Sequence, residues 1–435
     1  MLSIGPPALP LTPLAFQRAL RTGHGRALQH VLAHGTGGLD GILIEACLRC
    51  PTYNPQVEPS RAPWLARMLG QGELGQRALL AIEAAVEAGE PETEYSDREH
   101  RRDLLKEFAL NGVPAARALL YESFGRDPEW NDVLSAAQIV ELDGPGGLLH
   151  VAARIGRWLK EDASFWVNDE LLETLDTRLG AGTAETILES AAASDPMITQ
   201  YLAAVREWLK PSDPALESQV GRSWDADKVI EYVRSDAPGG ARWLTPWGRQ
   251  ATPEARARLF ETLLQEQNPE RAYRFLCVFT RAPAPAFDER LWQWLEAEDP
   301  NLSRAAVMAL GYLPHPRVRE GALSMLGRGN LHGILLFRSN YRPGDYEAIA
   351  RLLRPVPDDD QLNETTADLL EVVEANPQSE ARDCLLFAYE HSPSSYYRET
   401  SLRLLLALHE APLWVLEEAR FDASPDVASL CPSPA

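Results

Sequence analysis

Residues 299–327 read DPNLSRAAVMALGYLPHPRVREGALSMLG and predict two short helices joined by a tight turn. The Asp299-Pro300 pair opens the first helix, and Gly311 ends it. Pro316 then fits the first turn of the second helix, where its missing N–H costs nothing. A loop this short makes the two helices antiparallel neighbours.

The apolar side chains of this stretch predict how the two helices pack. Ala305 and Ala306 are small enough to let two helices approach closely, and Met308 helps to fill the remaining gap. We expect five side chains to be buried: Ala306, Val307, Leu310, Leu323 and Leu326.

The stretch resembles the HEAT repeat family, in the short form common in bacteria. The residues that match are Asp299-Pro300, Arg304, Ala305, Ala306, Leu310-Gly311, Val318-Arg319-Glu320 and Ala322-Leu323. The resemblance implies that Arg304 bridges to an acid in the loop of a neighbouring unit. Fainter echoes at Pro377–Arg382 and Pro393–Arg398 extend the resemblance over about residues 250–430, and before 250 it is only compositional.

Helical spacing dominates the remainder of the chain as well. Apolar residues recur at intervals of three and four, in segments that Gly, Pro or Asp-Pro terminate. No run of alternating β-branched residues predicts a strand. The chain is therefore expected to be all-α, a solenoid of antiparallel helix pairs that is HEAT-like at least in its C-terminal half.

Breaks in composition suggest three regions. Residues 1–215 form an N-terminal helical region, made of degenerate repeats or of a separate helical domain. Residues 216–422 form the HEAT-like array, and residues 423–435 form a frayed tail. Within the first region, the polar stretch 87–100 is expected to be a loop.

Charge and cysteine content limit the partners and the compartment. The formal net charge is −21, which argues against binding to nucleic acid and favours a partner with a basic surface. Five cysteines cannot form a complete set of disulfides, and the first ten residues lack the features of a signal peptide. No apolar stretch is long enough to cross a membrane. We expect a soluble cytoplasmic protein of bacterial type that does not bind membranes.

Two pairs of residues near the N-terminus have the side-chain types of a structural zinc site. His30 and His34 are four residues apart, and Cys47 and Cys50 are three apart, on successive predicted helices. The alternative is that Cys47 is a small core residue and that the histidines end a helix before Gly35. Because Cys-x-x-Cys zinc knuckles lie in turns, we expect no metal and no cofactor.

The loop from Tyr53 to Trp64 has three prolines, two aromatic residues and an opposed Glu58–Arg61 pair. A stiff polar-aromatic loop is a reasonable recognition element, so Tyr53, Arg61 and Trp64 are predicted to bind a partner. The alternative is that Tyr53 and Trp64 plug the helix junction while Glu58 and Arg61 make local bonds.

Tryptophans near arginines raise the possibility of DNA repair. Trp243, Trp247, Trp292 and Trp294 flank seven arginines, and HEAT-like DNA glycosylases use aromatic and acidic residues on a concave basic face. Acidic residues in the same stretch roughly cancel the charge, and core tryptophans with paired helix faces are the alternative.

None of the common catalytic sequence motifs occurs in the chain. We therefore expect a non-enzymatic scaffold or adaptor for protein binding, of the kind that serves bacterial immunity, defence or assembly. A HEAT-like DNA glycosylase or a bilin-lyase-like accessory enzyme is the alternative.

Overall fold

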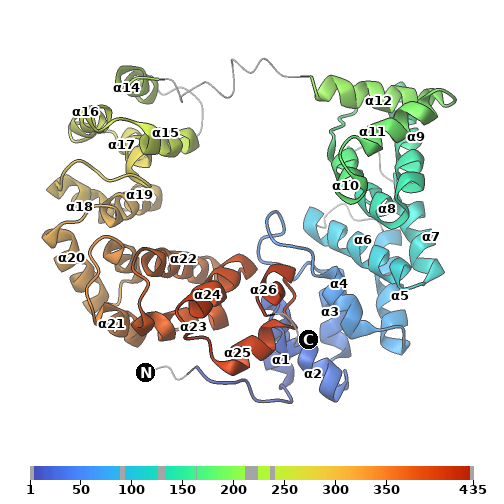
Figure 1. The fold of residues 1–435 in the computed structure, drawn as a ribbon, viewed down its shortest axis with the longest axis horizontal. Coiled ribbons are helices and arrows are strands. Elements are labelled where there is room, and N and C mark those ends of the chain that lie inside the picture. The colour runs from blue at the N-terminus through green and yellow to red at the C-terminus, as the bar shows by residue number, and fades with distance from the viewer. Residues whose placement is uncertain are drawn as a thin grey trace. The chain divides into compact units, whose positions relative to one another are not determined.

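The computed structural model describes residues 4–88, 94–125, 133–162, 164–210, 224–235 and 241–431. Every regular element within these ranges is a helix, as the all-α prediction required (Figure 1). Of the helices in these ranges, none combines the length and the apolar character that a membrane crossing demands.

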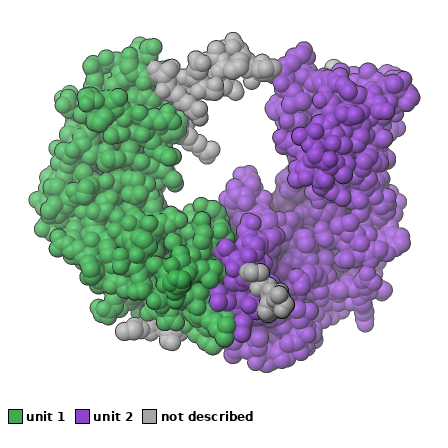
Figure 2. Space-filling view, in the orientation of Figure 1, with its two compact units in different colours: residues 1–6, 212–415 green, residues 7–211, 416–435 purple. Residues whose placement is uncertain are grey.

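The chain divides into two compact units, coloured separately in Figure 2. Unit 1 comprises residues 1–6 and 212–415, and unit 2 comprises residues 7–211 and 416–435. The boundary predicted at residue 215 lies in 211–223, outside the described residues.

Unit 2 contains most of the N-terminal helices and the end of the chain. Its helices are α1 Pro13–Thr22, α2 Arg26–His34, α3 Asp40–Leu48, α4 Ala62–Leu69, α5 Glu73–Glu87, α6 Tyr95–Leu110, α7 Pro114–Ser123, α8 Ala136–Asp143, α9 Pro145–Glu161, α10 Glu170–Leu179, α11 Thr183–Ala192, α12 Pro196–Trp208 and α26 Pro425–Ser429. One apolar core extends from Phe16 in α1 to Val205 in α12.

Helices α9 and α12 of unit 2 cross closely. A Cβ added at Gly156 of α9 would lie 1.9 Å from the carbonyl oxygen of Met197 in α12. Only glycine permits this approach, which brings α12 and its Tyr201 against α9.

Unit 1 has the same helical character. Its elements are α14 Ala226–Arg234, η2 Ala241–Trp243, α15 Leu244–Gln250, α16 Pro253–Leu263, α17 Pro269–Leu276, η3 Cys277–Phe279, α18 Glu289–Leu295, α19 Pro300–Gly311, α20 Pro316–Gly327, η4 Leu331–Phe337, α21 Asp345–Leu352, α22 Asp359–Ala375, η5 Ser379–Ala381, α23 Arg382–His391 and α24 Ser395–Ala407. Helix α25, Leu413–Ala419, begins in unit 1 and ends in unit 2.

The two helices predicted from residues 299–327 are α19 and α20, and their ends are as predicted. The Asp299 carboxylate accepts hydrogen bonds from the N–H groups of Asn301 and Leu302, which caps α19. Gly311 is the last residue of α19, and Pro316 is the first residue of α20. Local sequence signals therefore determine both helix ends.

Four of the five side chains predicted to be buried in this pair are buried, and one is not. Ala306, Val307, Leu310 and Leu326 are at most 4% exposed, but Leu323 is 45% exposed. The prediction for Leu323 is wrong because α20 packs through Val318, Ala322, Met325 and Leu326. Leu323 follows Ala322 by one residue, about 100° further around the helix, and faces away from that side.

Arg304 forms the interhelical bridge that the resemblance implies, but to a different kind of acid. Its guanidinium donates two hydrogen bonds to Asp368, at 2.7 and 2.6 Å. Asp368 lies within helix α22, so the expectation of a loop acid is corrected. A second bidentate pair, Arg319 with Asp345, ties α20 to the first turn of α21. Both helices of the pair are thus fastened to later elements of unit 1.

The expectation of a frayed tail at 423–435 is wrong as far as the described residues reach, to Cys431. Ala423 and Val427 are buried, and the Ala423 N–H donates to the carbonyl oxygen of Gly23. Just before this segment, Glu418 accepts hydrogen bonds from Arg26. These contacts depend on residues about 400 positions away, which local composition does not reveal.

The loop expected at 87–100 is also shorter than predicted. Helix α6 begins at Tyr95, and His100 is buried with its Nε2 2.9 Å from the carbonyl oxygen of Ala46. Residues 89–93 lie outside the described part of the chain. The charged residues of this segment misled the prediction because they occupy a helix that packs on α3 and α4.

Candidate functional site

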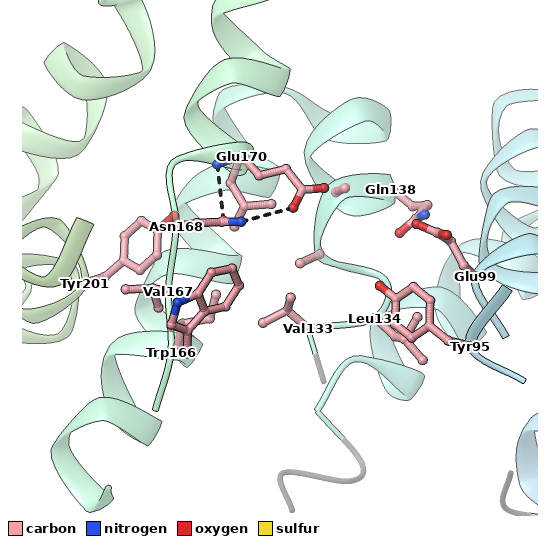
Figure 3. Close-up of a pocket in the computed structure, with 14 residues that line it drawn as sticks. Tyr95, Glu99, Val133, Leu134, Gln138, Trp166, Val167, Asn168, Glu170 and Tyr201 are labelled. Carbon is pink, nitrogen blue, oxygen red and sulfur yellow. Dashed lines mark hydrogen bonds between the residues drawn. The ribbon is translucent and has the colours of Figure 1, made fainter. Parts of the chain in front are cut away.

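Unit 2 contains an open pocket of about 580 Å³, solvent-filled mouth included (Figure 3). Helices α6, α8, α9, α10 and α12 and the segment before α10 contribute its walls. The glycine-mediated contact of α9 with α12 and the packing of α8 on α9 and α10 set the distances between these walls. The pocket thus gathers residues from five helices of a single unit.

Two carboxylates border the pocket from different elements. Glu99 comes from α6, and Glu170 begins α10; Figure 3 shows them on opposite sides of the open space. Among the lining residues that the structure describes, none is a lysine or an arginine. The pocket therefore offers negative charge from two directions.

Glu170 is held in place by the segment that precedes it. The side-chain oxygen of Asn168 accepts a hydrogen bond from the Glu170 N–H at 3.2 Å. The Asn168 amide group donates to the Glu170 carboxylate at 3.4 Å (Figure 3). These two exposed contacts favour one direction of the carboxylate.

Aromatic rings complete the pocket. Tyr95 and Trp166 line it, and Figure 3 shows both rings facing the open space. Trp166 is 51% exposed and meets Trp208 edge to face, with ring centroids 5.3 Å apart. Trp208 and Leu209 are about half exposed. An apolar aromatic surface of this kind, next to a pocket, is typical of a binding site.

Tyr201 of α12 contributes a buried hydroxyl group to the pocket. The residue is 1% exposed, and its hydroxyl has no hydrogen-bond partner among the described residues. Burial raises the pKa of this phenol, and the nearby charges of Asp169 and Glu170 raise it further. The group stays protonated at neutral pH and can both donate and accept a hydrogen bond. A buried polar group without a partner costs about 1–3 kcal/mol, which a ligand can recover.

Arg61 and Trp64, two of the three predicted partner-binding residues, lie in the interior of unit 2. Arg61 is 2% exposed and donates to the carbonyl oxygens of Leu20 and Pro51, both at 3.1 Å. Trp64 is 4% exposed, and its indole N–H donates to the carbonyl oxygen of Phe421.

The prediction that Arg61 and Trp64 anchor a partner is therefore corrected, because both side chains are buried and donate hydrogen bonds inside the unit. The stiff loop fastens helices to each other, as its alternative interpretation held. Tyr53 is partly exposed, and its role in partner binding stays a prediction.

The four residues considered for zinc are engaged separately. The Nδ1 atom of His30 accepts a hydrogen bond from the Leu11 N–H, and the Cys47 thiol donates to the carbonyl oxygen of Leu43. Burial raises the pKa of Cys47 to about 12. The His34 ring contacts the His30 ring, with centroids 5.5 Å apart, but the described residues contain no cluster of three or more potential metal ligands.

The tryptophans considered for DNA stacking mostly pack inside unit 1. Trp247 and Trp294 are buried, and the Trp247 indole N–H donates to the carbonyl oxygen of Trp224. Trp292 lies so close to Gly321 that a Cβ there would meet its ring at 1.8 Å. Trp243 stacks edge to face with Trp224. The arrangement is that of a packed aromatic core.

Comparison of the chain with protein-family models, with curated proteins and with solved structures finds no match. The site is therefore interpreted from its geometry. Sequence reasoning missed all of the pocket residues, since Tyr201 has the pattern of a core residue and Glu170 that of an ordinary first-turn acid. The aromatic Trp166 in a polar segment before a helix was the one local signal available.

Proposed function

We propose that the protein is a non-enzymatic interaction module that binds a basic segment of a partner protein through the pocket of unit 2. In this proposal the helices form a solenoid of antiparallel pairs, HEAT-like in residues 216–422. The capped α19–α20 pair and the absence of strands from the described residues support that architecture. A helical array offers an extended surface for a partner.

The observation that carries the proposal is the composition of the pocket walls. Glu99 and Glu170 supply negative charge, and Tyr95 and Trp166 supply aromatic faces. A cation is attracted to both, since an aromatic face within about 6 Å stabilises it by about 0.5–2 kcal/mol. None of the described lining residues is a lysine or an arginine, and the chain's own Arg98 lies over the Tyr95 ring, with its guanidinium carbon 5.8 Å from the ring centroid.

The charge of the whole chain supports the same kind of partner. A net charge of −21 attracts a basic protein from a distance and increases its association rate. Ions screen this attraction beyond about 8 Å at physiological ionic strength, so binding weakens as salt rises.

In cellular terms, the protein acts as an adaptor in bacterial immunity, defence or assembly. A reducing cytoplasm suits its five cysteines, all of them described and none paired in a disulfide. The exposed pair Trp166–Trp208 gives the partner an apolar contact beside the pocket.

A peptide-binding titration tests the proposal. A fluorescein-labelled decapeptide of mixed lysine and arginine is titrated with the full chain at low and at high salt, with duplex DNA in a parallel titration. We expect the peptide to bind and to weaken with salt, and the DNA not to bind. The Glu99→Gln/Glu170→Gln double variant is expected to lose at least about tenfold in affinity.

The control variant Glu83→Gln/Glu87→Gln removes the same charge from α5, outside the pocket. It is expected to stay within about twofold of the unchanged protein, since only long-range attraction is altered. Equal losses in the two double variants would show that net charge, and not the pocket, attracts the peptide. Tight DNA binding would favour the glycosylase alternative.

A further inference from the structure

We propose that the pocket of unit 2 selects an arginine side chain over a lysine side chain, and that Tyr201 is the residue that makes the distinction. This inference rests on the proposed function, because it names the part of the basic partner that enters the pocket. The two basic side chains carry the same charge but differ in shape and in number of donors. Arginine presents five N–H groups on a flat fork, and lysine presents three on a compact point charge.

The first argument is the placement of the acceptors. Glu170 and Tyr201 both line the pocket and come from different helices, α10 and α12. A guanidinium spreads its N–H groups to both edges of its plane and can donate toward two walls together. A single ammonium concentrates its donors at one point and favours one wall.

The second argument is the buried hydroxyl of Tyr201. It lines the pocket, is 1% exposed, and has no partner among the described residues. Figure 3 shows its oxygen on the side of Asn168 and Glu170. A guanidinium bound to Glu170 has further N–H groups left for this oxygen. The hydroxyl thereby gains the partner that the unbound pocket does not provide.

The third argument is that unit 1 contains the same chemistry, already assembled within the chain. The guanidinium carbon of Arg338 lies 3.7 Å from the ring centroid of Tyr312. Glu371 accepts a hydrogen bond from the Tyr312 hydroxyl at 2.7 Å and pairs with Arg338 at 3.4 Å. Tyrosine, glutamate and arginine thus form a compact set in which the guanidinium lies over the ring. The pocket of unit 2 supplies Tyr201 and Glu170 for such a set, and the partner supplies the arginine.

The experiment compares two labelled peptides of equal length and charge, one of nine arginines and one of nine lysines. Fluorescence anisotropy gives the dissociation constant of each for the full chain and for the Tyr201→Phe variant. We expect the arginine peptide to bind at least about tenfold more tightly than the lysine peptide. Removing the hydroxyl is expected to weaken arginine binding about tenfold and lysine binding less than about twofold.

Arginine peptides adhere to many acidic surfaces, so tighter binding of the arginine peptide is not enough by itself. The effect of Tyr201→Phe on the two dissociation constants decides whether Tyr201 selects arginine. Tyr312→Phe removes a phenolic hydroxyl in unit 1 and is expected to leave both dissociation constants unchanged. Glu170→Gln is a second pocket variant, and it is expected to weaken the arginine peptide even if Tyr201→Phe folds poorly. Circular dichroism at each titration temperature confirms the fold of every variant.

Two results overturn the inference in distinguishable ways. If Tyr201→Phe weakens neither peptide or both equally, while the Glu99→Gln/Glu170→Gln variant weakens both, arginine selection is wrong and the proposed function stands. If neither peptide binds the unchanged protein, the proposed function and the arginine inference fail together.

Discussion

Two ion pairs of unit 1 and the Tyr201 hydroxyl of unit 2 differ in how far their buried polar groups are satisfied. In the first, the buried carboxylate of Asp368 meets Arg304 through two hydrogen bonds, and Asp345 meets Arg319 in the same manner. In the second, the buried hydroxyl of Tyr201 has no partner among the described residues. One arrangement satisfies its charges internally, and the other leaves a buried hydroxyl without a hydrogen-bond partner.

This difference separates residues that stabilise the fold from residues that are available to a ligand. Arg304 and Asp368 are both charged, but they form an ion pair with each other, which fastens α19 to α22. The buried hydroxyl of Tyr201, in contrast, has no hydrogen-bond partner among the described residues. A high density of charged residues does not by itself mark a functional site. A buried polar group without a hydrogen-bond partner is the better indicator.

The largest effect is expected from Asp368→Ala. The substitution removes the bidentate partner of the partly buried Arg304 and leaves it Glu364 alone, at 2.8 Å, and breaking a buried pair costs about 3–5 kcal/mol. Urea unfolding followed by circular dichroism measures the loss. A double variant, Arg304→Met with Asp368→Leu, is expected to recover most of it, because an apolar pair leaves no buried charge. A loss below about 1 kcal/mol for Asp368→Ala would show that the pair does not fasten the helices.

Leu310→Ala is expected to lower the free energy of unfolding by about 2–5 kcal/mol, because truncating this fully buried side chain of α19 leaves a cavity in the core of unit 1. Leu323→Ala in the neighbouring α20 provides the matched control, since the same atoms are removed from a side chain that is 45% exposed. That control is expected to stay within about 0.5 kcal/mol of the unchanged protein. Similar losses at the two positions would contradict the assignment of the buried face of α20.

His100 is expected to make the protein less stable in mild acid. Burial lowers the pKa of His100 in the folded chain. Below about pH 6.5 the imidazole is therefore protonated in the unfolded chain and still neutral in the folded chain. Stability is therefore lost as pH falls through this range, by at most about 1.4 kcal/mol per pH unit for one proton.

His100→Gln keeps an N–H donor for the carbonyl oxygen of Ala46 and removes the titrating group. We expect its urea midpoint to fall less between pH 7 and pH 5 than that of the unchanged protein. Identical pH profiles would exclude His100 as a source of the acid sensitivity.

The smallest effect on stability is expected from Tyr201→Phe. Because the hydroxyl has no partner among the described residues, its removal is expected to leave the free energy of unfolding unchanged or to raise it by up to about 1 kcal/mol. Urea unfolding measures this too. A loss of 2 kcal/mol or more would reveal an internal hydrogen bond and would place Tyr201 with the stabilising residues of unit 1.

Local signals were enough to predict α19 and α20, but not their partners. The Asp299-Pro300 pair, Gly311 and Pro316 determine the ends of α19 and α20 through neighbouring backbone groups. Arg304 and Asp368 lie 64 residues apart, so nothing near either residue identifies the other. Trp64 is likewise buried against a distant segment, since its indole N–H donates to the carbonyl oxygen of Phe421. The proline-rich loop before Trp64 had led to the prediction that this residue is exposed and binds a partner.

The pocket was beyond prediction for the same reason. Its residues come from segments between Tyr95 and Tyr201, and each segment by itself resembles an ordinary amphipathic helix or turn. Tyr201 lines the pocket because Gly156 lets α12 approach α9, a contact 41 residues away in the sequence. Because residues distant in the sequence form the pocket, the local sequence around each of them does not predict it.

Hydrogen–deuterium exchange with and without the nine-arginine peptide tests the central claim most directly, because it shows where on the chain the basic ligand binds. We predict slower exchange on adding the peptide in α6, in residues 164–169 and in the first turn of α10, with no change in α19 or α22. Protection confined to α19 and α22, with none around the pocket, would contradict the account.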